Sequence, residues 1–338
     1  MTETNKHTII IAEVGVNHGG DFDLACRLVK LAAQAGADYV KFQTFKAENL
    51  VCADASRAEY QKRNCGGDET QLQMLKKLEL KAGDFSRLAD VCRSEGVGFL
   101  SSAFDSESIA LLNAIGLDYW KIPSGEITNL PYLEQIAACR GKIILSTGMS
   151  VAEEVAAAVA VLNAAGVPKS DIALLHCNTQ YPTPPADVNL RAMETLRSFG
   201  CGMTGYSDHT EGIAIPIAAV ALGAEIIEKH FTYDKNASGP DHKASADPAE
   251  FAAMVRGIRS TEAALGSPLK HVTDSERPNV AIARKSIVAS RHIAKGELLT
   301  PENITTKRPG TGISPMRWHE VTGTRAVTDF LPDQQIIL

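Results

Sequence analysis

The sequence predicts an α/β protein, a (β/α)8 TIM barrel followed by a small C-terminal β-rich domain. Up to about residue 265, a short apolar run rich in β-branched residues alternates eight times with an amphipathic stretch rich in alanine and leucine. Polar and ionisable residues gather at the carboxyl ends of the apolar runs, where the open rim of such a barrel lies. After residue 265, short β-type runs separated by turns replace this alternation.

Eight β-then-α units favour a barrel over an open doubly wound sheet. The expected strands are residues 8–14, 39–43, 98–101, 119–122, 142–146, 172–176, 201–206 and 224–230. The expected helices are residues 23–35, 84–95, 106–115, 130–139, 151–165, 190–199, 213–222 and 248–265. Several helices begin at Asp or Ser, which cap helix N-termini, and glycine follows several others, as at Gly36, Gly116 and Gly166.

The change in pattern divides the chain into three regions. We expect residues 1–266 to form the barrel, residues 267–282 a polar linker, and residues 283–338 a small all-β module. A module of that size buries little core by itself, so we expect it to lean on a barrel. Within the barrel, the long polar segment 51–72 is expected to be a lid or a substrate loop.

Composition excludes several classes of function. The chain of 338 residues has a formal net charge of -6, which argues against nucleic acid as a partner because a phosphate backbone selects basic surfaces. No apolar run approaches the roughly 20 residues that span a bilayer. The N-terminus passes directly into the first expected strand without a signal sequence. The seven cysteines form no CxxC pair, which is typical of reduced thiols. We therefore expect a cytoplasmic protein with no membrane partner.

Two histidines at the ends of adjacent expected strands, His209 and His230, could bind one divalent ion. An imidazole pair without cysteine suits manganese, iron, cobalt or zinc, and oxygen ligands in the remaining positions favour manganese or magnesium. The alternative for either histidine is a hydrogen-bonded structural role. Spacing alone leaves His18, His176 and His242 as further possible ligands near the same rim.

Two lysines, Lys41 and Lys121, lie within or at the end of expected strands, where a solvated lysine is not expected. Phosphate and carboxylate groups are recognised by fixed positive charge beside hydroxyl and amide donors. The Ser-Thr-Gly stretch at 146–148 adds hydroxyls just before a helix whose N-terminal amides can bind an anion. The alternative is that both lysines only pair with barrel glutamates such as Glu13 or Glu228.

Taken together, these motifs resemble the N-acetylneuraminate (sialic acid) synthase family, which includes legionaminic and pseudaminic acid synthases. The matching barrel stretches are IAEVGVNH (11–18), KFQT (41–44), KIPSGE (121–126), LSTGM (145–149), HCNTQYPTP (176–184), GYSDHT (205–210), EKHFT (228–232) and GPDHKAS (239–245). In the tail, KRPGTGIS (307–314) resembles the family's C-terminal antifreeze-like (SAF, β-clip) domain. The resemblance covers nearly the whole chain, and the motifs are highly specific as an ordered set.

The resemblance implies a transferase that condenses phosphoenolpyruvate with an N-acyl amino-mannose sugar. Carbon 3 of phosphoenolpyruvate attacks the open-chain aldehyde, a divalent metal polarises that aldehyde, and phosphate leaves after water attacks carbon 2. The resemblance implies His209 and His230 as ligands of the metal, Mn²⁺ first, with Mg²⁺ or Co²⁺ as alternatives. The residues it implies for phosphoenolpyruvate are Lys41, Lys121, Ser124 and Ser146, with Ser207 nearby.

Further residues match family positions by motif. Those that contact the sugar or the reacting centre in the family are Gln43, Glu126, Tyr181 and Asp241. Some members carry an asparagine as a phosphoenolpyruvate contact where this chain has Thr179, preceded by Asn178, so either residue is a candidate donor. Glu13 is a candidate to position water or to move a proton. Arg308 matches an arginine that reaches from the antifreeze-like domain into the partner's barrel, which implies a domain-swapped homodimer.

Four readings of the function follow. N-acetylmannosamine is the first expected acceptor, which makes the chain an N-acetylneuraminate synthase. The stretches 58–64, 69–80 and 187–193 resemble the legionaminic subgroup, so the alternative acceptor is 2,4-diacetamido-2,4,6-trideoxymannose. The second alternative is a phosphoenolpyruvate-dependent synthase acting on a phosphorylated aldose, although such enzymes need further basic residues and lack this tail. A carbohydrate- or ice-binding protein would leave the rim lysines, histidines and carboxylates without a use.

Overall fold

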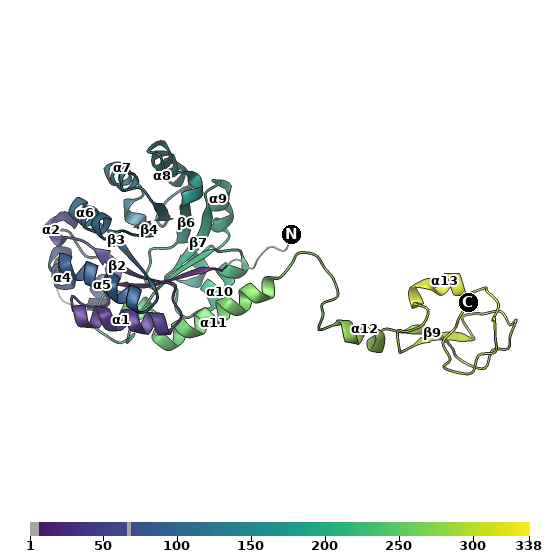
Figure 1. Ribbon diagram of the computed structural model, residues 1–338. Coiled ribbons are helices and arrows are strands. Elements are labelled where there is room, and N and C mark those ends of the chain that lie inside the picture. The colour runs from purple at the N-terminus through teal and green to yellow at the C-terminus, as the bar shows by residue number, and fades with distance from the viewer. Residues whose placement is uncertain (1–6, 66–68) are drawn as a thin grey trace. The chain divides into compact units, whose positions relative to one another are not determined.

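The computed structural model describes residues 7–65 and 69–338, and the chain divides into two compact units, Met1–Gly266 and Ser267–Leu338. The first unit is an eight-stranded parallel barrel surrounded by helices (Figure 1). Its strands are β1 (Ile9–Gly15), β2 (Tyr39–Thr44), β3 (Gly98–Ala103), β4 (Tyr119–Ile122), β5 (Lys142–Ser146), β6 (Ile172–Cys177), β7 (Met203–Asp208) and β8 (Ile226–His230).

The hydrogen-bonded order of the strands is β3-β2-β1-β8-β7-β6-β5-β4, and every pair is parallel. The two ends of this order, β3 and β4, also lie side by side, so the sheet curls into a nearly closed barrel. The predicted fold class is thus confirmed. The expected strands are all present, with ends that move by up to about two residues, as at β7, where Asp208 still belongs to the strand.

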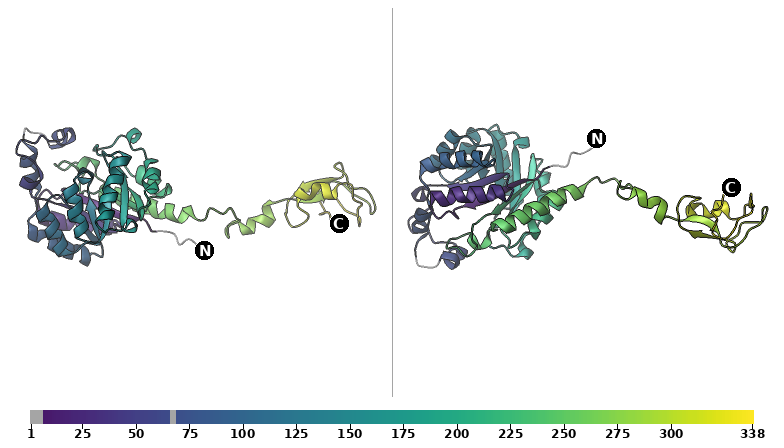
Figure 2. Two further views of the ribbon diagram at one scale, coloured as in Figure 1. Left: turned by 90° about the horizontal axis from the view of Figure 1, so that it is seen from above. Right: turned by 60° about the horizontal axis from the view of Figure 1, so that its bottom comes forward.

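The helices cover the outside of the barrel, as two further views show (Figure 2). They are α1 (Phe22–Gln34), α5 (Ala82–Ser94), α6 (Ser106–Ile115), α7 (Leu130–Ala138), α8 (Ala152–Ala164), α9 (Ala192–Ser198), α10 (Ala214–Ala221) and α11 (Pro248–Leu265). Side chains of Asp21, Asp105, Asn129 and Asp247 accept hydrogen bonds from backbone amides in the first turns of α1, α6, α7 and α11. Such caps satisfy donors that the helix leaves unpaired, so they determine where these helices begin.

The interior of the barrel has an apolar lower part and an ionisable upper part. Inward-facing residues near the strand starts, among them Ile11, Leu100 and Ile144, form one buried apolar cluster. Since side chains on the same face recur every second residue, the next inward residue after Ile11 is Glu13, close to the strand end. The apolar part closes the bottom of the barrel, and the ionisable residues collect at the carboxyl-terminal rim.

The segment between β2 and α5 contains short helices that the sequence analysis does not predict. Its described part includes α2 (Ala47–Leu50), α3 (Glu59–Cys65) and α4 (Gln71–Leu78), and the expected lid or substrate loop, residues 51–72, covers α3 and the start of α4. A capping box between Thr70 and Gln73 starts α4, and Met74 and Leu75 pack against Phe45. Short polar helices escape detection because a single buried turn leaves little periodicity in the sequence.

The second unit has its own apolar core. Strands β9 (Ser286–Ala289) and β10 (Ile304–Lys307) pair antiparallel, and the unit also contains α12 (Arg277–Ala283) and α13 (Trp318–Val321). Its buried apolar residues are Ile287, Ala289, Ile293, Leu299, Ile304, Val321, Ala326, Phe330 and Ile336. Residues 277–282 of the expected linker are helical, because α12 covers them and ends one residue later, at Ala283. Over the described parts of both units, no helix is both long enough and apolar enough to span a membrane.

Candidate active site

A cavity of about 260 Å³ opens at the carboxyl ends of the barrel strands. The residues singled out from the sequence that line it are Glu13, Lys41, Gln43, Lys121, Ser124, Ser146, Thr179, Tyr181, Ser207, His209 and His230. They come from β1, β2, β4, β5, β7 and β8 and from the segments that follow β4, β6 and β7. The barrel therefore brings together residues that are up to 217 positions apart in the chain, between Glu13 and His230.

Four buried side chains form a row of alternating charge at the base of this cavity. Lys41 Nζ lies 2.7 Å from Glu13 Oε2 and 3.7 Å from Glu228 Oε2. Lys121 Nζ lies 3.6 Å from Glu228 Oε1 on the other side. The two expectations for the lysines, anion binding and pairing with barrel glutamates, are therefore compatible. Both ammonium groups line the cavity while the carboxylates balance their charge.

Burial and neighbouring charges shift the pKa values along this row in different directions. Burial raises the pKa of Glu13 to about 7, although Lys41 opposes the shift. Burial works against the charged form of Lys41, but Glu13 and Glu228 outweigh it and raise the pKa of this lysine. Burial also disfavours ionised Glu228, yet Lys121 and Lys41 hold its pKa below the ordinary value. Burial lowers the pKa of Lys121, although Glu228 opposes the shift. When Glu13 is protonated and both lysines are charged, the row carries one net positive charge, which favours an anionic ligand.

Hydroxyl groups extend the cationic side of the cavity. Lys121 Nζ donates to Ser146 Oγ at 2.7 Å, and Ser207 Oγ donates to Glu228 Oε1 at 3.0 Å. The backbone amide of Gly148 donates to Ser124 Oγ at 2.9 Å. A Cβ atom at Gly148 would lie 2.9 Å from Ser124 Oγ, so only glycine allows this close approach. The result is a compact set of donors beside Lys121.

The two predicted metal ligands, His209 and His230, also line the cavity. The rings of His209 and His230 have centroids 5.3 Å apart, and the ring of Tyr181 packs against both. His209 Nδ1 contacts the backbone carbonyl of Asn178, which leaves Nε2 as the nitrogen with a free lone pair. His230 Nδ1 is buried and has no hydrogen-bond partner in the described structure. Burial lowers the pKa of His209 to about 4 and that of His230 well below its ordinary value, so both rings are neutral.

This arrangement fits one divalent ion. An ion about 2.1 Å from one nitrogen of each ring, with a ligand angle of about 90° to 110°, places the two centroids about 4.6 to 5.3 Å apart. Within residues 7–65 and 69–338, no group of three His, Cys, Asp or Glu side chains is arranged to hold a metal. Water or substrate would therefore supply the remaining ligands, as in catalytic sites that keep open positions.

Four of the residues that the family resemblance implies do not line the cavity, and neither do the further possible ligands His18, His176 and His242. Glu126 accepts a hydrogen bond from Asn129 Nδ2 at 2.7 Å, and the Asn178 side chain accepts one from the amide of Gln180. Asp241 lies one layer behind, with Oδ2 4.0 Å from His230 Nδ1. Burial raises the pKa of Asp241 to about 6. Arg308 belongs to the second unit, where its Nε donates to the carbonyl of Ala283.

The cavity also includes residues to which the motifs assign no role. Ser102, Cys177 and Glu228 line it, and Ser102 Oγ is buried without a partner in the described structure. The alternation of side chains along β3 could have predicted that Ser102 points into the barrel. Leu100 belongs to the apolar cluster inside the barrel, and side chains two residues apart lie on the same face of a strand. Ser101 points the other way and pairs with Thr44 Oγ1 at 2.7 Å.

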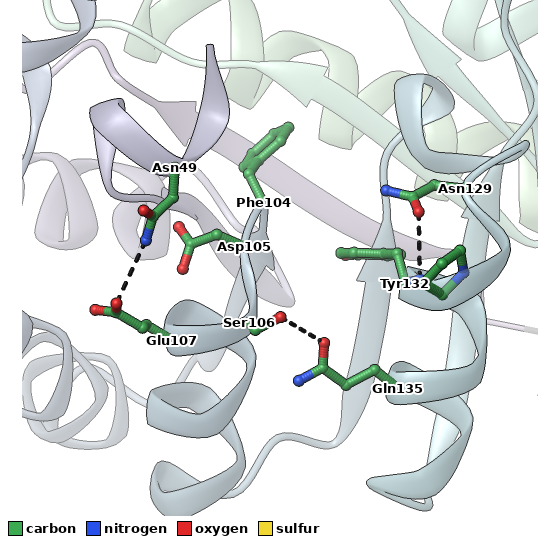
Figure 3. Close-up of a pocket in the computed structure, with 9 residues that line it drawn as sticks. Asn49, Phe104, Asp105, Ser106, Glu107, Asn129, Tyr132 and Gln135 are labelled. Carbon is green, nitrogen blue, oxygen red and sulfur yellow. Dashed lines mark hydrogen bonds between the residues drawn. The ribbon is translucent and has the colours of Figure 1, made fainter. Parts of the chain in front are cut away.

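A second pocket lies between α2 and the first turns of α6 and α7 (Figure 3). Its lining residues are Asn49, Phe104, Asp105, Ser106, Glu107, Asn129, Pro131, Tyr132 and Gln135. No lysine, arginine or histidine is among them, so the pocket does not suit a phosphorylated ligand. The Asp105 carboxylate already accepts from the Lys46 and Ser108 amides, which gives it a structural role. The barrel cavity is therefore the better candidate for chemistry on an anion.

Comparison with known proteins identifies the family of this chain. The NeuB family model matches residues 28–270, and the SAF domain model matches residues 284–336. The chain is 50% identical over 331 residues to the N,N'-diacetyllegionaminic acid synthase of Campylobacter jejuni, covering 98% of this chain and 99% of the relative. It is 47% identical over 318 residues to the enzyme of the same name from Legionella pneumophila, covering 94% and 89%.

Among solved structures, the chain resembles the N-acetylneuraminic acid (sialic acid) synthetase of Leptospira borgpetersenii. The TM-score is 0.71 at 34% sequence identity, covering 82% of this chain and 92% of that one. The family match covers residues 28–270, which is most of the barrel. This chain belongs to the NeuB family and carries a C-terminal SAF domain.

Proposed function

We propose that this chain is an N,N'-diacetyllegionaminate synthase, which condenses phosphoenolpyruvate with 2,4-diacetamido-2,4,6-trideoxymannose. The observation that carries the chemistry is one cavity lined by two buried lysines and by two neutral imidazoles. The choice of acceptor is supported by the 50% and 47% identity to synthases of that name. These relatives favour the diacetamido sugar over N-acetylmannosamine, the acceptor expected first from the sequence.

The cationic side suits the phosphate and carboxylate of phosphoenolpyruvate. Lys41 and Lys121 offer point charges in a setting that excludes most water, where charge-assisted hydrogen bonds are strong. Ser124, Ser146 and Ser207 add hydroxyl donors, and Thr179 lines the same cavity while Asn178 does not. Thr179 is therefore the better candidate of the two for a direct contact. A proton on Glu13 would make the surrounding row cationic when the ligand arrives.

His209 and His230 would hold the divalent metal, with Mn²⁺ as the first choice and Mg²⁺ or Co²⁺ as alternatives. When bound, the ion supplies Lewis-acid polarisation of the sugar aldehyde. The tautomer of His209 suits this role because its Nδ1 faces the Asn178 carbonyl. Gln43 and Tyr181 line the cavity and are placed to contact the sugar, and Asp241 would act from behind His230.

The reaction balances with these residues. Carbon 3 of phosphoenolpyruvate forms a bond to the aldehyde carbon, and the aldehyde oxygen gains a proton. Water then adds to carbon 2 and loses one proton, which balances the proton gained by the aldehyde oxygen. The bond between carbon 2 and the phosphate oxygen breaks as the remaining hydroxyl proton leaves, so carbon 2 becomes a ketone and inorganic phosphate carries that proton away. Glu13 can hold a proton or accept one from this water, because its pKa near 7 makes both forms available at neutral pH.

Arg308 and Glu126, which lie outside the cavity, are also proposed to contact the acceptor sugar. We propose a domain-swapped homodimer in which Arg308 of one protomer completes the acceptor site of its partner. The exposure of Arg308 in the second unit is compatible with such a role. Glu126, from the turn after β4, would contact the acceptor only after leaving its present partner Asn129.

The test is phosphate release from phosphoenolpyruvate with Mn²⁺, comparing the diacetamido sugar with N-acetylmannosamine. The proposal expects a kcat/KM at least tenfold higher for the diacetamido sugar. A higher value for N-acetylmannosamine would make the chain an N-acetylneuraminate synthase instead. Release only with a phosphorylated aldose would overturn both.

A further inference from the structure

A buried ion pair on the outer face of the barrel lies directly behind the two histidines. Asp208 on β7 and Lys229 on β8 are register partners, and Lys229 Nζ lies 2.5 Å from Asp208 Oδ2. Both side chains are at most 1% exposed. Each precedes one of the histidines by one residue, and since strand side chains alternate, His209 and His230 point to the inside.

The Asp208 carboxylate also shapes the turn that contains His209. Its Oδ1 accepts from the Thr210 amide at 3.1 Å and from Thr210 Oγ1 at 2.8 Å, which closes an Asx turn around His209. The same oxygen accepts from Tyr206 Oη at 3.1 Å. Lys229 Nζ donates a second bond to the Thr210 carbonyl at 2.9 Å. A lysine on β8 thus holds both sides of the turn that carries His209.

The backbone carbonyls of the two histidines accept hydrogen bonds from residues outside β7 and β8. The His209 carbonyl accepts from the Thr183 amide, and the His230 carbonyl accepts from the Ala246 amide, each at 2.8 Å. The register pairs between β7 and β8 end at Asp208 and Lys229. Beyond this point Lys229 provides the polar link from the His230 strand to the turn of His209.

We propose that Asp208 and Lys229 are positioning residues that set the separation and orientation of His209 and His230 for one divalent ion. The pair does not line the cavity and touches no substrate. An apolar pair of similar volume could stabilise the fold equally well, because the attraction of a buried ion pair is largely offset by desolvation. What directional bonds add is a defined geometry, and residues that orient metal ligands in this way affect metal affinity. The proposal rests on the metal site proposed above.

The experiment measures metal binding apart from turnover. The full-length double variant Asp208→Asn/Lys229→Met and the single variant Lys229→Met are compared with wild type. Free Mn²⁺ is followed by electron paramagnetic resonance, and the visible absorption of bound Co²⁺ reports ligand geometry. We expect Mn²⁺ affinity to fall about tenfold or more in both variants, with a changed Co²⁺ spectrum. KM for phosphoenolpyruvate should stay within about twofold, because its ligands are untouched. The double variant removes both buried charges, so neither is left without a partner. It can therefore be used for the metal-binding measurement if the single variant fails to fold.

A matched control lies at the opposite end of the barrel, where Arg259 Nη2 on α11 pairs with Asp38 Oδ2 at 3.1 Å. Arg259→Met should lower stability but leave Mn²⁺ affinity and the Co²⁺ spectrum unchanged. Lys229→Arg, which keeps the charge and several donors, should restore most of the affinity. Wild-type affinity and an unaltered spectrum in the folded double variant would overturn the proposal. Absence of Mn²⁺ binding in wild type would instead overturn the metal site itself.

Discussion

The ammonium group of Lys41 lies 2.7 Å from a carboxylate oxygen of Glu13, and both side chains are at most 5% exposed. This contact begins the charged row that continues through Glu228 to Lys121. The row places two cations against the cavity without leaving either one unbalanced inside the barrel. Such balance is needed because an unpaired buried charge is costly. His209 and His230 line the same cavity as this row.

Replacement of Lys41 by methionine should impair both binding and stability. It removes one cation that faces the ligand, so kcat/KM for phosphoenolpyruvate should fall roughly 10- to 100-fold. It also removes the cation that Glu13 and Glu228 share, so these buried carboxylates lose charge compensation. This loss should lower the free energy of unfolding by about 3 kcal/mol. Steady-state kinetics and urea unfolding measure the two effects. Lys142→Met, at the exposed start of β5, is the control and should change neither.

The raised pKa of Glu13 predicts a pH dependence of stability. In the folded protein the carboxyl protonates near pH 7, against an ordinary value of 4.5, so folding favours its acid form. This contribution is complete below about pH 4.5 and is lost as pH rises through 7, at up to about 1.4 kcal/mol per pH unit. Urea unfolding of wild type and Glu13→Gln at pH 5, 6, 7 and 8 should show a weaker decline in the variant. Parallel curves would contradict the assignment.

Removal of one imidazole should abolish metal binding without unfolding the barrel. In His230→Ala, only His209 remains of the pair, so we expect Mn²⁺ affinity to fall at least 100-fold together with metal-dependent turnover. Equilibrium dialysis and circular dichroism check binding and folding. His176→Gln is the matched control, because His176 lies in the same barrel on β6, two strands from β8, and its ring bonds the Val188 carbonyl. Mn²⁺ binding that survives in His230→Ala would remove His230 from the site.

A single methyl group at Gly148 should disturb the donor set beside Lys121. The new Cβ would lie 2.7 Å from Thr179 Cγ2 and 3.0 Å from Cys177 Sγ, so these side chains must move. We expect KM for phosphoenolpyruvate to rise about tenfold in Gly148→Ala, with a smaller effect on the KM of the sugar. Gly83→Ala in α5 meets no atom within 4 Å and should slightly stabilise the protein. Equal KM values for phosphoenolpyruvate in the two variants would contradict this account.

Much of the barrel was readable in the chain because strands and helices leave local periodicities. Alternation and strand ends also pointed to Lys41, Lys121, His209 and His230 before any geometry was known. The helices between residues 47 and 78 were missed, since each spans only four to eight residues. Motif resemblance identified the family but placed N-acetylmannosamine before the diacetamido sugar as the expected acceptor. The two relatives at 50% and 47% identity favour the opposite order.

The sequence by itself determined the barrel, the β-rich tail and the rim on which the chemistry gathers, because these depend on patterns within a few neighbouring residues. Only the tertiary structure decided which rim residues share a cavity. It shows that Glu228 lies between Lys41 and Lys121, and that Glu126 bonds to Asn129 outside the cavity. These contacts join residues on different strands and loops, and their distances depend on register and rotamer. No local pattern encodes such distances, since barrel closure alone brings these parts of the chain together.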